Sequence, residues 1–311
     1  MYRYEDFKEY VAKEIIALLP EKYKGYTVSI KTQHKVNKDV DVMLVEEPFD
    51  QEKSQTCGPA LNLNNLFMEY IRTRNINMTM ARVVDEFLKM EEISKKVLKD
   101  FDFEGKDIKK QIIFQLINYR QNKELLKEVP HRRFLDLAVI YRIFINNDGC
   151  HETAIIKEKT AKKLNLSEES LYKYAERNTR RLMPIVTFKL KDRIQHMMPQ
   201  FMEIPEEIIQ EIAGDKMYVL TNAGSAYGAT GLLYNDALKM VTSKIGKRVH
   251  IVPSSMHEVN ITPIQMNPEE LSEIIQLTNA DSVDIEDRLS NSVYMFDGTN
   301  LSLAFESDRR L

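Results

Sequence analysis

The sequence predicts an α+β fold, with a small N-terminal lobe of helix, hairpin and helix and a larger lobe in which helices flank a mixed β-sheet. Residues 216–265 read as a strand, a glycine-bearing turn, an amphipathic helix and two further strands. Residues 26–47 alternate with the period of two that is typical of strands. The chain has 311 residues, of which 43% are apolar, and this is enough for the core of one large or two ordinary domains.

The smaller lobe is predicted to comprise residues 1–105, and Gly105 marks its boundary with the larger lobe at 106–311. The first apolar stripe has helical spacing and stops at Pro20, because proline cannot continue a helix. The predicted elements are, in order, a helix over 4–19, a hairpin over 26–47, a short strand over 60–65, a helix over 66–74 and a long helix over 83–101.

The larger lobe is predicted to centre on residues 134–145, the most strand-like run in the chain. This run is apolar on both alternating faces except for Asp136, Tyr141 and Arg142, as expected of a central strand that is covered on both sides. If the strands at 217–221 and 248–252 are parallel neighbours, the helix between them must cross over right-handed.

Capping residues and turns predict the other elements of this lobe. Ser167 and Asn267 are good N-caps for two helices, and residues 297–300 form the turn of a final hairpin. Residues 185–205 show no clear period and are left undecided between structure and a mobile connection.

Composition narrows the function classes. Lys and Arg number 44 against 47 Asp and Glu, so the net charge of -3 gives no overall reason to expect a nucleic-acid or membrane partner. The two cysteines are far apart, which fits a reducing compartment and argues against a disulfide framework or a thiolate zinc site. The start of the chain lacks the pattern of a signal peptide, and no apolar run is long enough to span a membrane. We therefore expect a cytoplasmic protein without metal or cofactor.

Several phrases together resemble a bacterial family of unknown function, DUF5688: VPHRRFLDLAVIYRIF, AERNTRR, NAGSAYGATGLLY, PSSMHEV and DRLSNSVYMFD. The resemblance covers nearly the whole chain. More distantly, the order of elements looks like that of the uncharacterised YtpQ-like family. Both resemblances imply a cytoplasmic bacterial protein with an α+β fold, and neither implies a catalytic residue.

The first candidate for chemistry is the turn that holds Ser254, His257 and Glu258, because a turn between strands can present a base, a carboxylate and a hydroxyl together. It lacks the second histidine of the HExxH zinc motif, so a structural role is the favoured interpretation.

Asp136 is the second candidate. A carboxylate in an apolar strand needs a partner, and an ion pair with His131, Arg132, Arg133 or Arg142 is favoured over a perturbed acid in a cleft.

The candidate ligand-binding residues are Asn222, Gly224, His131, Arg132, Arg180 and Arg181. Asn222 and Gly224 lie where a phosphate-binding loop would, but the GxGxxG and GK[ST] patterns are absent. The basic cluster from Arg177 to Arg193 is diluted by acidic neighbours, so a solvated helix face is favoured over a nucleic-acid contact.

We therefore predict a non-enzymatic protein that binds another macromolecule, most simply an unknown protein partner. The first alternative is a hydrolase-like enzyme with its site near the Ser254 to Glu258 turn, and the second is a nucleic-acid-associated protein. The hydrolase alternative requires that this turn, residues 222–228 and residues 131–136 meet in one concave pocket, with His257 bound to a carboxylate.

Overall fold

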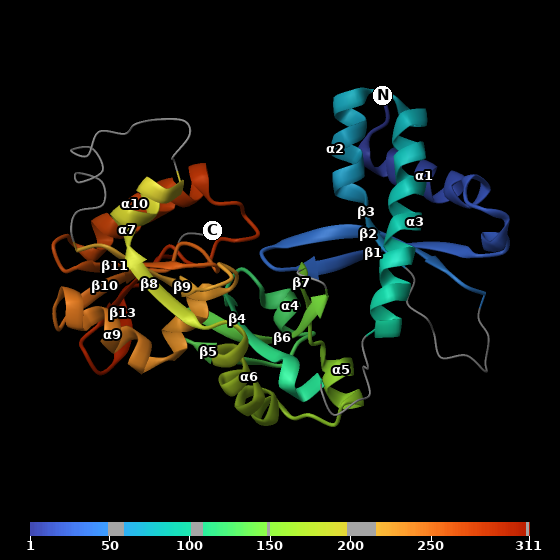
Figure 1. The fold of residues 1–311 in the computed structure, drawn as a ribbon. Helices are drawn as coiled ribbons and strands as arrows, with labels where there is room; N and C mark the ends of the chain where they lie inside the picture. Colours follow the sequence, from blue (N-terminus) through green and yellow to red (C-terminus); the bar gives the residue numbers. More distant parts are fainter. Residues whose placement is uncertain (49–58, 101–107, 148–149, 198–215, 309–310) are drawn as a thin grey trace. The chain divides into compact units, whose positions relative to one another are not determined.

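The computed structural model describes residues 1–48, 59–100, 108–147, 150–197, 216–308 and 311. The fold is α+β, as predicted, and the chain divides into two compact units, Met1–Phe103 and Glu104–Leu311 (Figure 1). The predicted boundary residue, Gly105, lies outside the described residues.

The smaller unit packs helices on one three-stranded antiparallel sheet of order β1-β2-β3. In the hairpin, Lys35 pairs with Lys38, and Asn37 takes a left-handed conformation in the turn. Aromatic and aliphatic side chains from every helix fill the core. The elements are α1 (Tyr4–Leu18), η1 (Glu21–Tyr23), β1 (Thr27–Lys35), β2 (Lys38–Glu46), β3 (Ala60–Asn62), α2 (Leu63–Thr73) and α3 (Ile76–Asp100).

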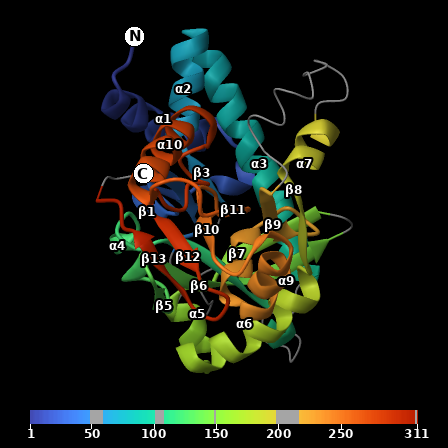
Figure 2. The ribbon, with the colours of Figure 1, turned by 90° about the vertical axis from the view of Figure 1, so that its left-hand side faces the viewer.

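The larger unit contains two sheets. In the four-stranded sheet, β6 pairs with β4 on one side and with β5 and β7 on the other, and α6 packs on β4. The six-stranded sheet has the order β13-β12-β10-β11-β9-β8 (Figure 2). The strands are β4 (Ile112–Asn118), β5 (His131–Phe134), β6 (Leu137–Asn147), β7 (Cys150–Ile155), β8 (Ile185–Lys189), β9 (Tyr218–Asn222), β10 (Val249–Val252), β11 (Val259–Pro263), β12 (Val293–Phe296) and β13 (Leu301–Phe305).

Helices cover both sheets of this unit, and α9 and α10 lie on opposite sides of the six-stranded sheet (Figure 1). The expected N-caps are present, since Ser167 accepts from the Ser170 N–H and Asn267 accepts from the Glu269 N–H. The helices are η2 (Ile108–Gln111), α4 (Lys123–Leu126), α5 (Glu158–Lys163), α6 (Glu168–Leu182), α7 (Leu190–Met197), η3 (Gly228–Leu233), α9 (Asn235–Ile245) and α10 (Pro268–Ser282). No helix within these described ranges is long and apolar enough to cross a membrane.

The sheets differ from the prediction in topology. Every pairing between the described strands is antiparallel, so the unit is built on two antiparallel sheets rather than one mixed sheet. Strands β9 and β10 are not neighbours, because β11 lies between them, and β6 belongs to the other sheet.

The predicted central strand at 134–145 is in fact interrupted by a turn. Leu135 has a φ of 55°, and the chain reverses there from β5 into β6. No glycine or proline marks this turn, and β6 is apolar on both faces. Hydrophobic periodicity alone therefore could not separate the two strands.

Candidate functional site

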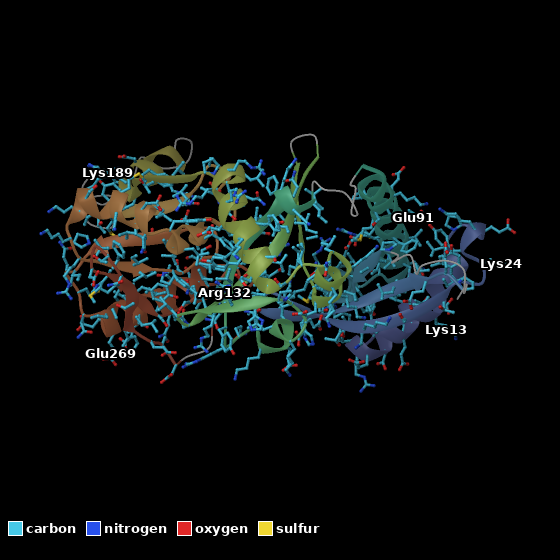
Figure 3. All side chains as sticks on the ribbon, turned by 90° about the horizontal axis from the view of Figure 1, so that it is seen from below. Lys13, Lys24, Glu91, Arg132, Lys189 and Glu269 are labelled. Atoms are coloured by element: carbon cyan, nitrogen blue, oxygen red, sulfur yellow. The ribbon has the colours of Figure 1, made fainter. Side chains whose placement is uncertain are left out.

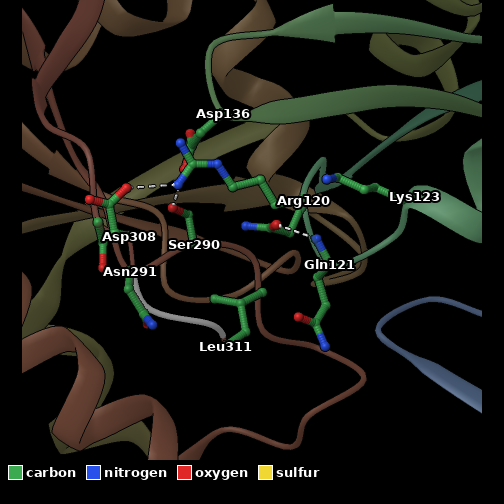
Figure 4. A pocket seen from close by; sticks show the side chains of 10 residues that line it. Arg120, Gln121, Lys123, Asp136, Ser290, Asn291, Asp308 and Leu311 are labelled. Atoms are coloured by element: carbon green, nitrogen blue, oxygen red, sulfur yellow. Dashed lines mark hydrogen bonds and ion pairs between the residues drawn. The ribbon is translucent and has the colours of Figure 1, made fainter.

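The larger unit contains a polar cavity of about 440 Å³. Its walls come from the segment after β4, from the turn between β5 and β6, and from the chain around β12 and after β13. Arg120, Lys123, Asp136, Ser290 and Asp308 are among the side chains that line it (Figure 4). Charged and hydrogen-bonding groups therefore dominate the lining.

Asp136 lies in the wall of this cavity and is only 6% exposed. Its carboxylate accepts three hydroxyl hydrogen bonds, from Ser290 at 2.6 Å, Ser292 at 2.9 Å and Tyr294 at 2.5 Å. Burial, and then the negative charge of Asp136, raise the pKa of Tyr294 well above its usual value, so the phenol stays a donor.

The expected ion pair of Asp136 with a nearby cation is therefore replaced by hydroxyl donors. The neighbouring cations are engaged elsewhere: Arg132 pairs with Glu168, and the Arg133 guanidinium donates to the Leu135 carbonyl. The His131 ring bonds to the Val129 carbonyl oxygen at 3.0 Å. The hydroxyl donors lie 154 to 158 residues further along the chain, which is why local sequence could not reveal them.

Arg120 stands beside this carboxylate. It forms ion pairs with Glu306 at 2.7 Å and Asp308 at 3.0 Å, both in the segment that follows β13. The hydrogen bond that Arg120 donates to Asp308 and the charges of Glu306 and Asp136 raise the pKa of Arg120. A cation thus links the cavity wall to the C-terminal segment.

His257 forms a second cluster, between residues 222–228 and the segment before β12. Its Nε2 lies 3.0 Å from an Asp287 carboxylate oxygen, and its Nδ1 lies 3.3 Å from the Tyr227 backbone nitrogen. Because the backbone N–H can only donate, Nδ1 is the acceptor and Nε2 carries the proton that bonds to Asp287. The Tyr227 ring stacks on the imidazole with centroids 5.9 Å apart. Both ring nitrogens are therefore occupied within the protein.

The other residues of this turn also make internal contacts. The Ser255 hydroxyl accepts from the His257 backbone N–H at 3.1 Å, and the Ser254 carbonyl accepts from the Leu289 N–H at 2.9 Å. Glu258 pairs with Arg193 at 2.6 Å. No described hydroxyl is hydrogen-bonded to an imidazole nitrogen of His257 as a nucleophile would be in a serine hydrolase.

The backbone N–H groups of the loop at 222–228 are hydrogen-bonded within the protein. Asn222 Oδ1 accepts from the N–H groups of Gly224 at 3.0 Å and Ala226 at 3.3 Å, while the Tyr227 N–H bonds to His257. The following element is a 3-10 helix of six residues. The N–H groups of residues 223–227, which a phosphate would need, therefore already have acceptors within the protein.

Gly228 allows this loop to approach the histidine turn closely. A Cβ atom at this position would lie 2.3 Å from the His257 carbonyl oxygen and 2.3 Å from the Thr221 hydroxyl. That hydroxyl itself donates to the same carbonyl at 2.7 Å. Only glycine fits between these groups without displacing them.

The contacts of Arg142 near the 222–228 loop were not predicted from the sequence. It donates to Gln115 Oε1 at 2.8 Å and to Thr153 Oγ1 at 2.7 Å, and its guanidinium lies 5.2 Å from the centroid of the Tyr227 ring. Burial lowers its pKa. These contacts join the four-stranded sheet to the 222–228 loop, and no short-range pattern in the sequence signals them.

The candidate basic residues are spread among separate partners. Arg132 makes a bidentate pair with Glu168, at 3.1 and 2.9 Å. Arg180 makes one with Asp236, with both distances 2.7 Å. Arg181 donates to the Lys110 carbonyl at 2.5 Å. Figure 3 shows nitrogen and oxygen tips intermixed over the surface of each unit.

The convergence that the hydrolase alternative requires is thus partial. Residues 222–228 and 254–258 meet at His257, whereas Asp136 lines the cavity, of which neither His257 nor Ser254 is a lining residue. The two clusters are linked through the backbone, since the N–H of Ser290 donates to the Pro253 carbonyl. Within the described ranges, no group of three or more His, Cys, Asp or Glu residues is placed to hold a metal ion.

Comparison with known proteins gives the family and nothing further. No curated protein and no solved structure matches the chain. A family model does match, over residues 4–298, and by this match the chain belongs to the family of unknown function DUF5688.

Proposed function

We propose that this is a non-enzymatic protein that acts by binding another protein, and that it does so through the outer face of α10. The observation that carries the proposal is the exposure of Ile274 and Leu277. These two side chains lie one helical turn apart and are 47% and 73% exposed. The opposite face of α10 is anchored in the core, where Ile275 packs against Val252 and Val293.

The surroundings of this face indicate the chemistry of the partner. Helix α10 contains Glu269, Glu270, Glu273 and Asp281 and no lysine or arginine. Three further large apolar side chains are exposed in the flanking segments: Ile264, Met266 and Ile285. Exposed apolar groups within an acidic rim suit a partner surface that is apolar at its centre and basic at its edge.

The hydrolase alternative has less support because His257 has no free ring nitrogen to act as a general base. The nucleic-acid alternative has less support because Arg180, Arg181 and Arg193 are engaged by acceptors within the protein. A cytoplasmic location is part of the proposal, and it rests on the low cysteine content and nearly balanced charge.

The test is an affinity capture from the cells in which the protein is native, followed by binding of the captured protein in purified form. The wild type is compared with the double variant Ile274→Ser, Leu277→Ser. The control is Met240→Ser, which changes an exposed apolar residue of α9 instead. We expect the double variant to bind at least about 10-fold more weakly and the control to bind as the wild type does.

A captured protein that binds the double variant as tightly as the wild type would refute the α10 interface. The enzymatic alternative is tested in parallel with His257→Ala in a broad hydrolase substrate screen. Turnover by the wild type that this variant abolishes would refute the non-enzymatic assignment.

A further inference from the structure

We infer that the polar cavity of the larger unit is a binding site for a ligand that carries both a carboxylate and a hydrogen-bond donor, such as an acidic amino acid or an acidic peptide. Lys123 and Arg120 provide the charged contacts. The inference concerns a site separate from the α10 face and does not rest on the proposed protein partner.

The first support is that the cavity already receives carboxylates from this chain. Arg120 binds those of Glu306 and Asp308, and Asp308 is part of the cavity lining. The Asp308 side chain is 95% exposed, so this ion pair contributes little to stability and an external carboxylate can displace it at small cost.

The second support is an uncommitted cation at the same cavity. Lys123 lines it from the start of α4 and, within the part of the chain that the structure describes, makes no ion pair or side-chain hydrogen bond (Figure 4). Lys127 at the other end of α4 differs, since it pairs with Glu124 at 2.6 Å. A carboxylate between Lys123 and Arg120 would receive charge-assisted hydrogen bonds from both.

The third support comes from the opposite wall. Asp136 repels an anion, so the ligand carboxylate must lie toward Lys123, which Figure 4 shows apart from both Asp136 and Asp308. The carboxylate oxygens of Asp136 and the amide oxygen of Gln121 are acceptors in this lining, and they favour a ligand whose far end carries N–H or O–H groups. A volume of about 440 Å³ lies in the range of small-molecule and peptide pockets.

The test is isothermal titration calorimetry of the full chain at low salt with two probes. The first is L-glutamate, and the second is the peptide acetyl-Phe-Glu-Ser-Asp-amide, which copies residues 305–308. Binding of glutamate assigns the site to a free acid, and binding of the peptide alone assigns it to an acidic segment of a protein. The variants are Lys123→Met, the matched control Lys127→Met, and Asp308→Asn, which removes the internal competitor.

We expect saturable one-to-one binding of at least one probe. Lys123→Met should weaken it at least about 10-fold, whereas Lys127→Met should leave it unchanged. Asp308→Asn should strengthen it a few-fold, about 2- to 5-fold for loss of an exposed ion pair. The inference is overturned if neither wild type nor Asp308→Asn binds either probe up to roughly 10 mM. It is also overturned if Lys123→Met and Lys127→Met bind alike.

Discussion

The two carboxylates Asp136 and Asp287 illustrate two ways in which a fold satisfies an acidic side chain. Asp136 is buried and takes three neutral hydroxyl donors. Asp287 is 39% exposed and bonds to a histidine that is itself 33% exposed. The first arrangement stabilises the folded state, because loss of the carboxylate would leave buried hydroxyl donors without an acceptor. In the second arrangement water can replace either partner, so the bond contributes less to stability. The pair that looks more like a catalytic dyad is therefore the one on which folding depends less.

The largest expected effect is that of Asp136→Ala. Removal of the carboxylate leaves the hydroxyls of Ser290, Ser292 and Tyr294 without their acceptor, and we expect a loss of about 4 kcal/mol in the free energy of unfolding. Urea unfolding of the full chain, with hydrogen exchange of β6 and β12 to assign the transition, measures it. Asp136→Asn keeps one acceptor oxygen and should lose about half as much. A loss below about 1 kcal/mol for the alanine variant would show that the cavity hydrates these hydroxyls.

Gly228→Ala should have the next largest effect, and it tests the histidine cluster. The new methyl group would lie 2.3 Å from the His257 carbonyl oxygen, so the loop and the turn must separate, at a cost of about 3 kcal/mol. We expect the variant to be less stable, and we expect the His257 ring signals in its NMR spectrum to shift. Gly224→Ala is the control, because its nearest contact would be an ordinary 3.6 Å. Equal stability of the two variants would contradict the close approach.

The loss of stability at alkaline pH should distinguish the Asp136 cluster from the His257 cluster. The folded-state pKa of Tyr294 is raised by burial and by Asp136. The stability that depends on its neutral form is therefore complete below the unfolded pKa of about 10 and is lost as the pH rises above it. In Tyr294→Phe this loss should be smaller by about 1 kcal/mol per pH unit between about pH 10 and 11. Urea midpoints measured across this range provide the comparison. Parallel curves for the two proteins would exclude Tyr294 as a contributor.

The smallest effect is expected for Asp287→Asn. The exposed pair with His257 contributes less than about 1 kcal/mol, and the amide oxygen can still accept from Nε2. Thermal unfolding should show a shift of at most a few degrees, about 2–4 °C. If Asp287→Asn proved as damaging as Asp136→Asn, burial would not be what distinguishes the two carboxylates.

Local signals were sufficient for most elements but not for their assembly. Ser167 and Asn267 cap the helices they were expected to cap, because a cap depends on amides only a few residues away. The need of Asp136 for a partner was also readable from its apolar surroundings. Its actual donors follow from the packing of the β5–β6 turn against the chain at 290–294, which leads into β12 of the other sheet, and a single sequence carries no direct information on such packing. The same holds for the bond between His257 and Asp287, 30 residues apart.

The spacing of the three donors to Asp136 restricts how this part of the chain can change length. Ser290, Ser292 and Tyr294 are two residues apart, and each donates to the same carboxylate. Tyr294 lies in β12, and in a strand the deletion or insertion of one residue turns every following side chain to the opposite face. A single-codon deletion between 290 and 294 would therefore remove donors from the carboxylate at one stroke, although each remaining residue was unchanged. The hydrogen bonds to Asp136 should therefore restrict insertions and deletions in this segment more strongly than they restrict substitutions.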